Sequence, residues 1–246
     1  MQSIVPWLLW TPLLGQAVGR TELSTFPNRC PRDMAFVRAD HPETVTHTTC
    51  NTVKWGTCTG FESSKMTVSG PVRQVNACMD IYEAPNIKGA RPYVMKSGEE
   101  AGNWCHERGK RLCTEYEWES ACEGPEHLPF GYGWSADESC NTQRAWKPFN
   151  ASLLMQGGTL AELETERLWQ GDTSGDRATC TNIQGVHDLL GNAEEWVTAS
   201  RRYKYPLVLM GGHWAKPWQK CRMTNYAHEP FFRFYEVGFR CCSDPT

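Results

Sequence analysis

The chain has 246 residues, of which 40% are hydrophobic and 22% charged, and its net charge is −3. A mean hydropathy of −0.54 excludes a multispanning membrane protein. Without an excess of basic residues, binding to nucleic acid or to an anionic membrane is not expected. A chain of this length can bury a hydrophobic core, so we expect its 12 cysteines to reinforce that core.

The first 19 residues are uncharged and largely apolar, and they end in small side chains, which predicts a signal peptide over residues 1–19. The run is too short and too rich in proline for a membrane span. An even number of cysteines without any CxxC pair favours disulfides in a secreted or periplasmic protein over zinc binding. The alternative is a cytosolic protein with reduced thiols. Residues 20–33 are expected to form a linker, and residues 34–246 a single domain.

Three pairs in which Ser or Thr precedes Glu by three residues predict helices that begin after Ser97, Thr114 and Thr159. Gly109 and Gly124 are expected to end the first two. With 21 glycines and 15 prolines along the chain, the remainder should be short strands, turns and long loops. The candidate strands are 34–37, 93–95, 207–210 and 237–241. We therefore expect an α+β domain with little regular secondary structure.

Four motifs occur in a fixed order: CMDIYE at 78–83, GKRLCTEYEWE at 109–119, GVHDLLGNAEEW at 185–196, and GGHW at 211–214 followed by VGFRC at 237–241. Together they resemble the formylglycine-generating enzyme family, also called sulfatase-modifying factor, over about residues 34–243. The resemblance implies a fold related to C-type lectin-like domains, and it says less about chemistry.

The resemblance also implies a calcium site. The matching family positions are Asp188, Gly191, Ala193 and Glu195, of which the middle two bind through backbone oxygens. Hard cations such as calcium prefer oxygen ligands of this kind. Asn141 resembles part of a second calcium site. The alternative interpretation is an acidic surface turn.

One disulfide follows from the resemblance, between Cys105 and Cys241. The family partner of the Cys122 position falls at Tyr226 here, so Cys122 must pair elsewhere. Its candidate partners are Cys221 and Cys242, and two further suggested pairs are Cys140–Cys180 and Cys50–Cys58.

Catalytic members of the family oxidise a substrate cysteine to formylglycine, using oxygen and a copper(I) ion held by two cysteines. The matching positions here are Lys216 and Cys221, and the family's serine after the Gly-Gly pair is His213. An ammonium group cannot replace a soft thiolate ligand. We therefore expect no copper oxidase site and a binding or structural module for a peptide, a protein or a small molecule.

Two enzymatic alternatives remain open. The first is a formylglycine-generating oxidase that uses Cys221 and His213 with other ligands. The second is a non-haem iron enzyme whose ligands come from His213, His228, Glu229 and Glu236. Aromatic residues near these positions are expected to be mostly core, unless some of them line a cleft. They are Trp214, Trp218, Phe231, Phe232, Phe234 and Tyr235.

Overall fold

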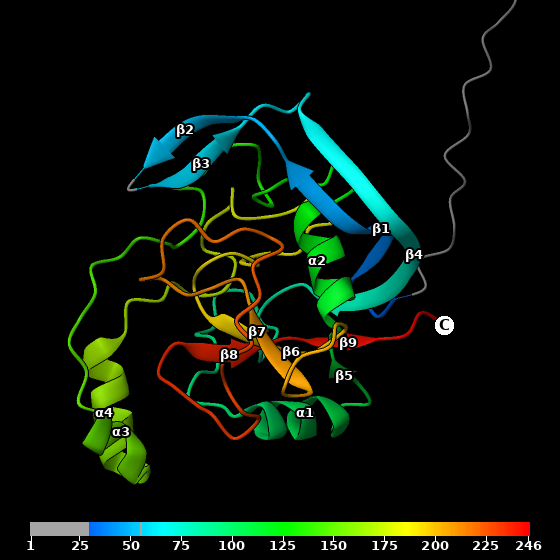
Figure 1. Ribbon diagram of the computed structural model, residues 1–246. Coiled ribbons are helices and arrows are strands. Elements are labelled where there is room, and N and C mark those ends of the chain that lie inside the picture. The colour runs from blue at the N-terminus through cyan, green and yellow to red at the C-terminus, as the bar shows by residue number, and fades with distance from the viewer. Residues whose placement is uncertain (1–29, 55) are drawn as a thin grey trace, which may run out of the picture.

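The computed structural model describes residues 30–54 and 56–246, so the predicted signal peptide and most of the linker lie outside the described residues. In chain order the elements are β1 (Met34–His47), β2 (Cys50–Lys54), β3 (Thr57–Phe61), β4 (Met66–Asp80), α1 (Gly98–His106), β5 (Arg111–Leu112), α2 (Glu115–Glu123), α3 (Ala151–Gln156), α4 (Gly158–Leu168), β6 (Glu194–Thr198), β7 (Leu207–Met210), β8 (Val237–Phe239) and β9 (Cys241–Ser243). Long loops connect them (Figure 1). The predicted α+β fold with little regular structure is confirmed.

Two small sheets form the centre of the fold. One has the strand order β1-β4-β9-β5, and the other has the order β7-β6-β8. The β1 and β4 strands form a long antiparallel pair in which Met34 lies opposite Asp80. The β2–β3 hairpin, which lies between them in the chain, forms a separate two-stranded sheet. The C-terminal strand β9 lies between β4 and β5, so it connects the short edge strand β5 to the rest of the first sheet. Helix α2 packs against the β1–β4 pair (Figure 1).

The first two helices begin where the sequence predicts. The side chain of Ser97 accepts a hydrogen bond from the backbone N–H of Glu100, and the Glu100 carboxylate accepts one from the backbone of Ser97. Thr114 and Glu117 make the same reciprocal pair at the start of α2. These contacts satisfy N–H groups that the first turn of a helix leaves without partners.

The third predicted helix exists as α4, but no side chain caps its N-terminus. The preceding helix α3, which Asn150 caps, was not predicted. The prediction of a strand at 93–95 is wrong, because Met95 has a positive φ of 57° that interrupts extended backbone. The predicted strand 237–241 divides into β8 and β9 at Arg240, and strand 207–210 is present as predicted.

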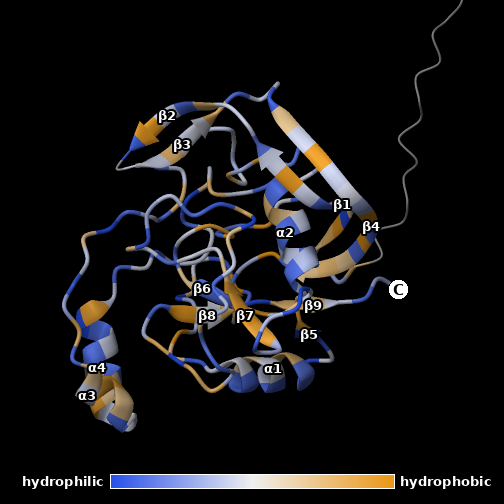
Figure 2. Ribbon diagram, in the orientation of Figure 1, coloured by the Kyte–Doolittle hydropathy of each residue, from blue (hydrophilic) through white to orange (hydrophobic). Residues whose placement is uncertain are grey.

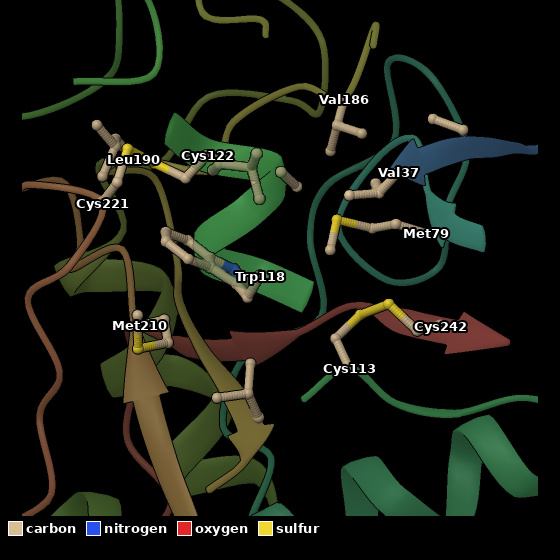
Figure 3. Packing of buried hydrophobic residues seen from close by; sticks show 14 of the residues in the cluster. Val37, Met79, Cys113, Trp118, Cys122, Val186, Leu190, Met210, Cys221 and Cys242 are labelled. Carbon is tan, nitrogen blue, oxygen red and sulfur yellow. A yellow bond between two sulfur atoms is a disulfide. The ribbon is translucent and has the colours of Figure 1, made fainter. Parts of the chain in front are cut away.

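Buried aromatic and sulfur-containing side chains fill the core. Trp118 of α2 is fully buried, and it lies between the Cys122–Cys221 disulfide and Met210 of β7 (Figure 3). Figure 2 shows apolar residues along β7 at the centre of the molecule and polar residues on much of α1. The core therefore joins α2 to the β7-β6-β8 sheet.

All 12 cysteines form disulfides. The structure contains the predicted Cys105–Cys241 pair and, of the two alternatives for Cys122, the bond to Cys221. The pairs Cys50–Cys58 and Cys140–Cys180 are present as suggested, and the unpredicted pairs are Cys30–Cys78 and Cys113–Cys242. Within the described part of the chain, no helix has the length and apolar character that crossing a membrane requires.

Candidate functional site

A buried ion pair holds the end of the 185–196 motif. The guanidinium of Arg240 is completely buried. Its Nε donates to the two carboxylate oxygens of Glu195 at 3.0 and 2.8 Å, and one Nη donates at 2.6 Å. The indole N–H of Trp118 donates to the same carboxylate at 2.9 Å. Glu195 therefore has partners for both oxygens within the protein.

A second carboxylate, Glu83, organises the preceding turn. The side-chain amide of Asn192 donates to both Glu83 oxygens at 3.0 and 3.1 Å. The hydroxyl of Ser174 donates at 2.9 Å, and the backbone N–H of Ala193 at 3.3 Å. Burial, together with the negative charges of Asp188 and Glu195, raises the pKa of Glu83 well above its ordinary value.

The turn itself has an unusual backbone. Asp188, Gly191 and Asn192 all have positive φ, at 58°, 76° and 52°. A Cβ at Gly191 would lie 2.3 Å from the backbone oxygen of Asn141, so only glycine fits there. One oxygen of Asp188 accepts a hydrogen bond from the backbone N–H of Gly175 at 2.6 Å. Burial raises the pKa of Asp188 to about 6.

The acidic cluster contains Asp188 and Glu195, the two carboxylates of the implied calcium site. Three buried carboxylates, from Glu83, Asp188 and Glu195, face a single guanidinium, that of Arg240. No group of three or more His, Cys, Asp or Glu side chains is placed to hold a metal ion among the described residues. A calcium ion here would therefore need backbone oxygens as well, a role that the resemblance gives to Gly191 and Ala193.

The second calcium site does not fit the residues present. The side-chain oxygen of Asn141 accepts a hydrogen bond from Nε of Arg144 at 2.8 Å. The neighbouring carboxylate, Asp172, forms ion pairs with both Arg144 and Arg177. Guanidinium groups therefore occupy the positions that a cation would need.

Neither copper-ligand position holds a thiolate. Cys221 forms a disulfide with Cys122. Nζ of Lys216 lies 2.9 Å from a carboxylate oxygen of Glu194, which also accepts a hydrogen bond from the side chain of Asn225. As a disulfide sulfur, Cys221 has no thiolate charge with which to bind a metal ion.

The four residues of the iron alternative are not brought together. His213 lies 3.5 Å from Glu236, whereas the ring of His228 stacks on Phe232 with centroids 3.7 Å apart. The side chain of Glu229 is exposed. Burial lowers the pKa of His213 to about 4 and raises the pKa of Glu236 to about 8. At neutral pH the contact between His213 and Glu236 is therefore one between uncharged groups.

Glu236 should make stability depend on pH. The unfolded chain loses the Glu236 proton near pH 4.5, whereas the folded chain keeps it to about pH 8. Between these values the folded state binds more protons, so this contribution to stability is lost as pH rises. In urea unfolding between pH 5 and 8, Glu236→Gln should therefore gain stability relative to the parent as pH increases. The exposed Glu229→Gln should not, and equal pH dependence of parent and Glu236→Gln would contradict the assignment.

The aromatic residues near His213 divide into two groups. Trp214, Trp218 and Tyr235 are buried. Phe231, Phe232 and Phe234 instead line a cavity of about 880 Å³. The cavity also has contributions from α3 and from the loops before β7 and β8, namely Leu154, Met155, Tyr205, His228 and Glu229. The expectation that most of these aromatic residues are core holds for half of them.

Sequence reasoning missed Glu83, Arg240 and the α3 residues of the cavity. For Arg240 a signal exists, because it lies between the apolar residues Phe239 and Cys241 of a predicted strand. A charged side chain in such a run is buried only when it has a partner. Glu83 and α3 carry no comparable signal.

Comparison with known proteins gives the family. The model of the sulfatase-modifying factor enzyme 1-like domain matches residues 44–245. Two curated relatives are named inactive C-alpha-formylglycine-generating enzyme 2. The protein from Mus musculus is 28% identical over 163 residues, and the one from Bos taurus is 30% identical over 161 residues. The matched region covers 62% of this chain and 49% and 50% of theirs, so the chain spans about half the length of these relatives.

Solved structures share the fold at low sequence identity. PvdO from Pseudomonas aeruginosa superposes with a TM-score of 0.51 at 16% identity, over 86% of this chain and 92% of PvdO. CarF superposes with a TM-score of 0.51 at 12% identity, over 88% of this chain and 99% of CarF. With the family match over most of its length and this shared fold, the chain belongs to the sulfatase-modifying factor family.

Proposed function

We propose that the protein is an exported binding module of the sulfatase-modifying factor family that lacks the copper oxidase site. One observation carries the proposal: both copper-ligand positions have other partners, because Lys216 pairs with Glu194 and Cys221 is bonded to Cys122. The inactive-enzyme names of the Mus musculus and Bos taurus relatives support it.

The aromatic cavity supports the binding role. Its volume of about 880 Å³ is in the range of roughly 300–1,000 Å³ typical of ligand sites. Phe231 is 66% exposed at this cavity, and such exposed aromatic surface favours apolar contact with a peptide, a protein or a small molecule. Nothing in the oxidase chemistry is required for such binding.

The disulfides support export. All 12 cysteines are paired, and structural disulfides persist in oxidising compartments such as the periplasm and the extracellular space. We therefore propose that the protein resides in one of these compartments. Calcium is the cofactor that we propose for the 188–195 turn.

The formylglycine assay tests the loss of oxidase chemistry. A Cys-x-Pro-x-Arg peptide is incubated with the protein, copper(I), oxygen and a thiol reductant, and its mass is measured. The parent chain should leave the peptide cysteine unchanged, because Lys216 offers no thiolate. Copper-dependent conversion to the aldehyde by the parent chain would overturn the proposal.

A rebuilt site is the positive control. Lys216→Cys supplies one thiolate, and Cys122→Ser frees Cys221 to supply the other. Glu194→Gln removes the carboxylate that loses its ion-pair partner when Lys216 is replaced. This triple variant should bind copper(I) in a stoichiometric titration. The matched variant with Lys216→Ser in place of Lys216→Cys has one thiolate and should bind it far more weakly. If both variants bind copper(I) equally weakly, the scaffold has lost more than the one ligand at position 216.

A further inference from the structure

A second cavity, of about 590 Å³, lies between α4 and the segment 91–96. It is separate from the copper-ligand positions, and it adjoins the aromatic cavity because Glu100 and Arg233 line both. Neither the family motifs nor the proposed binding role assigns a ligand to it.

Fixed backbone forms one wall of this cavity. The backbone N–H of Met95 donates to the oxygen of Phe234 at 3.0 Å, and the indole of Trp196 donates to the oxygen of Lys96 at 3.0 Å. The opposite wall is one face of α4, to which Gly158, Ala161 and Thr165 contribute at helical spacing. Hydrogen bonds hold the segment 91–96 in place and a helix forms the opposite wall, so the cavity is preformed.

The charges that line the cavity are not all paired. Arg91 forms an ion pair with Glu166, and Arg233 lies 3.8 Å from Glu100. The half-buried Lys96 lines the cavity, and its ammonium group interacts with the carboxylate of Glu100 through charge and not through a hydrogen bond. A half-buried ammonium whose N–H groups are not used in hydrogen bonds can donate them to an anion.

The start of α4 adds to this preference. Gly157 and Gly158 line the cavity, no side chain caps the helix there, and its first turn has no acidic residue. The N–H groups of such a turn carry partial positive charge and bind anions.

Thr165 provides an independent sign of a missing partner. It lines the same cavity and is 6% exposed, yet its hydroxyl has no hydrogen-bond partner among the described residues. A buried hydroxyl without a partner is costly, and a polar ligand would remove that cost.

We propose that this cavity binds a small organic anion with an apolar body. The carboxylate, or an equivalent oxyanion, lies at Lys96 and the first turn of α4. The apolar body lies along Val94 and Met95 toward the adjoining aromatic cavity, where Phe232 and Phe234 offer aromatic surface. Three carboxylates line the cavity, of which Glu166 pairs with Arg91 and Glu100 lies beside Arg233. The third, Glu162, opposes an anion and is exposed to solvent.

Calorimetric titration with 4-phenylbutyrate tests the proposal, with 4-phenylbutanamide and 4-phenylbutylamine as neutral and cationic controls of the same shape. The carboxylate should bind saturably and at least about tenfold more tightly than either control, as expected for a charge-assisted hydrogen bond. Lys96→Met should weaken 4-phenylbutyrate binding by a similar factor. Lys88→Met, which removes an exposed lysine outside the cavity, should leave it unchanged.

A variant that should strengthen binding of the anion provides a second test. Glu162→Gln should tighten 4-phenylbutyrate binding, because it removes the opposing charge. Weaker binding by Glu162→Gln, binding of the amide or amine as tight as that of the carboxylate, or no effect of Lys96→Met would each overturn the proposal. None of these results depends on copper or formylglycine chemistry, so they leave the proposed loss of oxidase activity to its own assay.

Discussion

Removing the two disulfides that bind the C-terminal strand should cost more than the sum of the single removals. Cys241 and Cys242 are neighbours in β9, and they bond to Cys105 and Cys113. While one bond is intact, the other closes only a short loop, so each single removal should cost about 3 kcal/mol of unfolding free energy. Removing both releases a longer loop and should cost more than about 6 kcal/mol.

The four cysteines are buried, so alanine is the replacement that leaves no unpaired hydroxyl in the core. Urea unfolding of Cys105→Ala/Cys241→Ala, Cys113→Ala/Cys242→Ala and the quadruple variant measures the three free energies. The matched control is Cys50→Ala/Cys58→Ala, which opens a bridge between residues only 8 apart in the β2–β3 hairpin. Strict additivity, or a control as costly as the quadruple variant, would contradict the argument.

Local interactions were the predictable part of the fold. The residues of each capping box are three apart, as in Ser97 with Glu100, so sequence spacing alone specifies the contact. The absent strand at 93–95 shows the limit of such reasoning. There a hydrogen bond from Met95 to Phe234, far along the chain, accompanies a backbone conformation that the apolar pattern does not reveal.

The candidate site depends on contacts between residues that lie far apart in the chain. Glu83 and Asn192 are 109 residues apart, and Arg240 and Glu195 are 45 apart. The sequence shows which residues are charged, but the chain topology decides which charges meet. The family resemblance supplied the Cys105–Cys241 pair across 136 residues, and it supplied Asp188 and Glu195. The resemblance did not supply the buried side chains that contact Asp188 and Glu195, nor the cavity between α4 and segment 91–96.

Chelation of calcium should lower the melting temperature of the protein. Without a bound cation, burial beside Glu195 raises the pKa values of Glu83 and Asp188, so keeping these two groups ionised in the folded chain costs free energy that a bound cation would offset. A ligand that binds only the folded state stabilises it by about 2.7 kcal/mol at a free concentration 100 times its dissociation constant. Melting curves in calcium and in excess chelator, with magnesium as the ion control, measure this difference.

The choice of variant follows from the hydrogen bonds in the cluster. Glu195→Ala would leave the buried guanidinium of Arg240 unpaired, and it would destabilise the fold whether or not calcium binds. Asp188→Ala removes a proposed ligand but leaves that ion pair intact, so it should abolish the response to chelator. Glu166→Ala, which removes an exposed carboxylate on α4, should retain the full response. Melting curves of the parent that coincide with and without chelator would mean that Arg240 alone balances the charge of the turn.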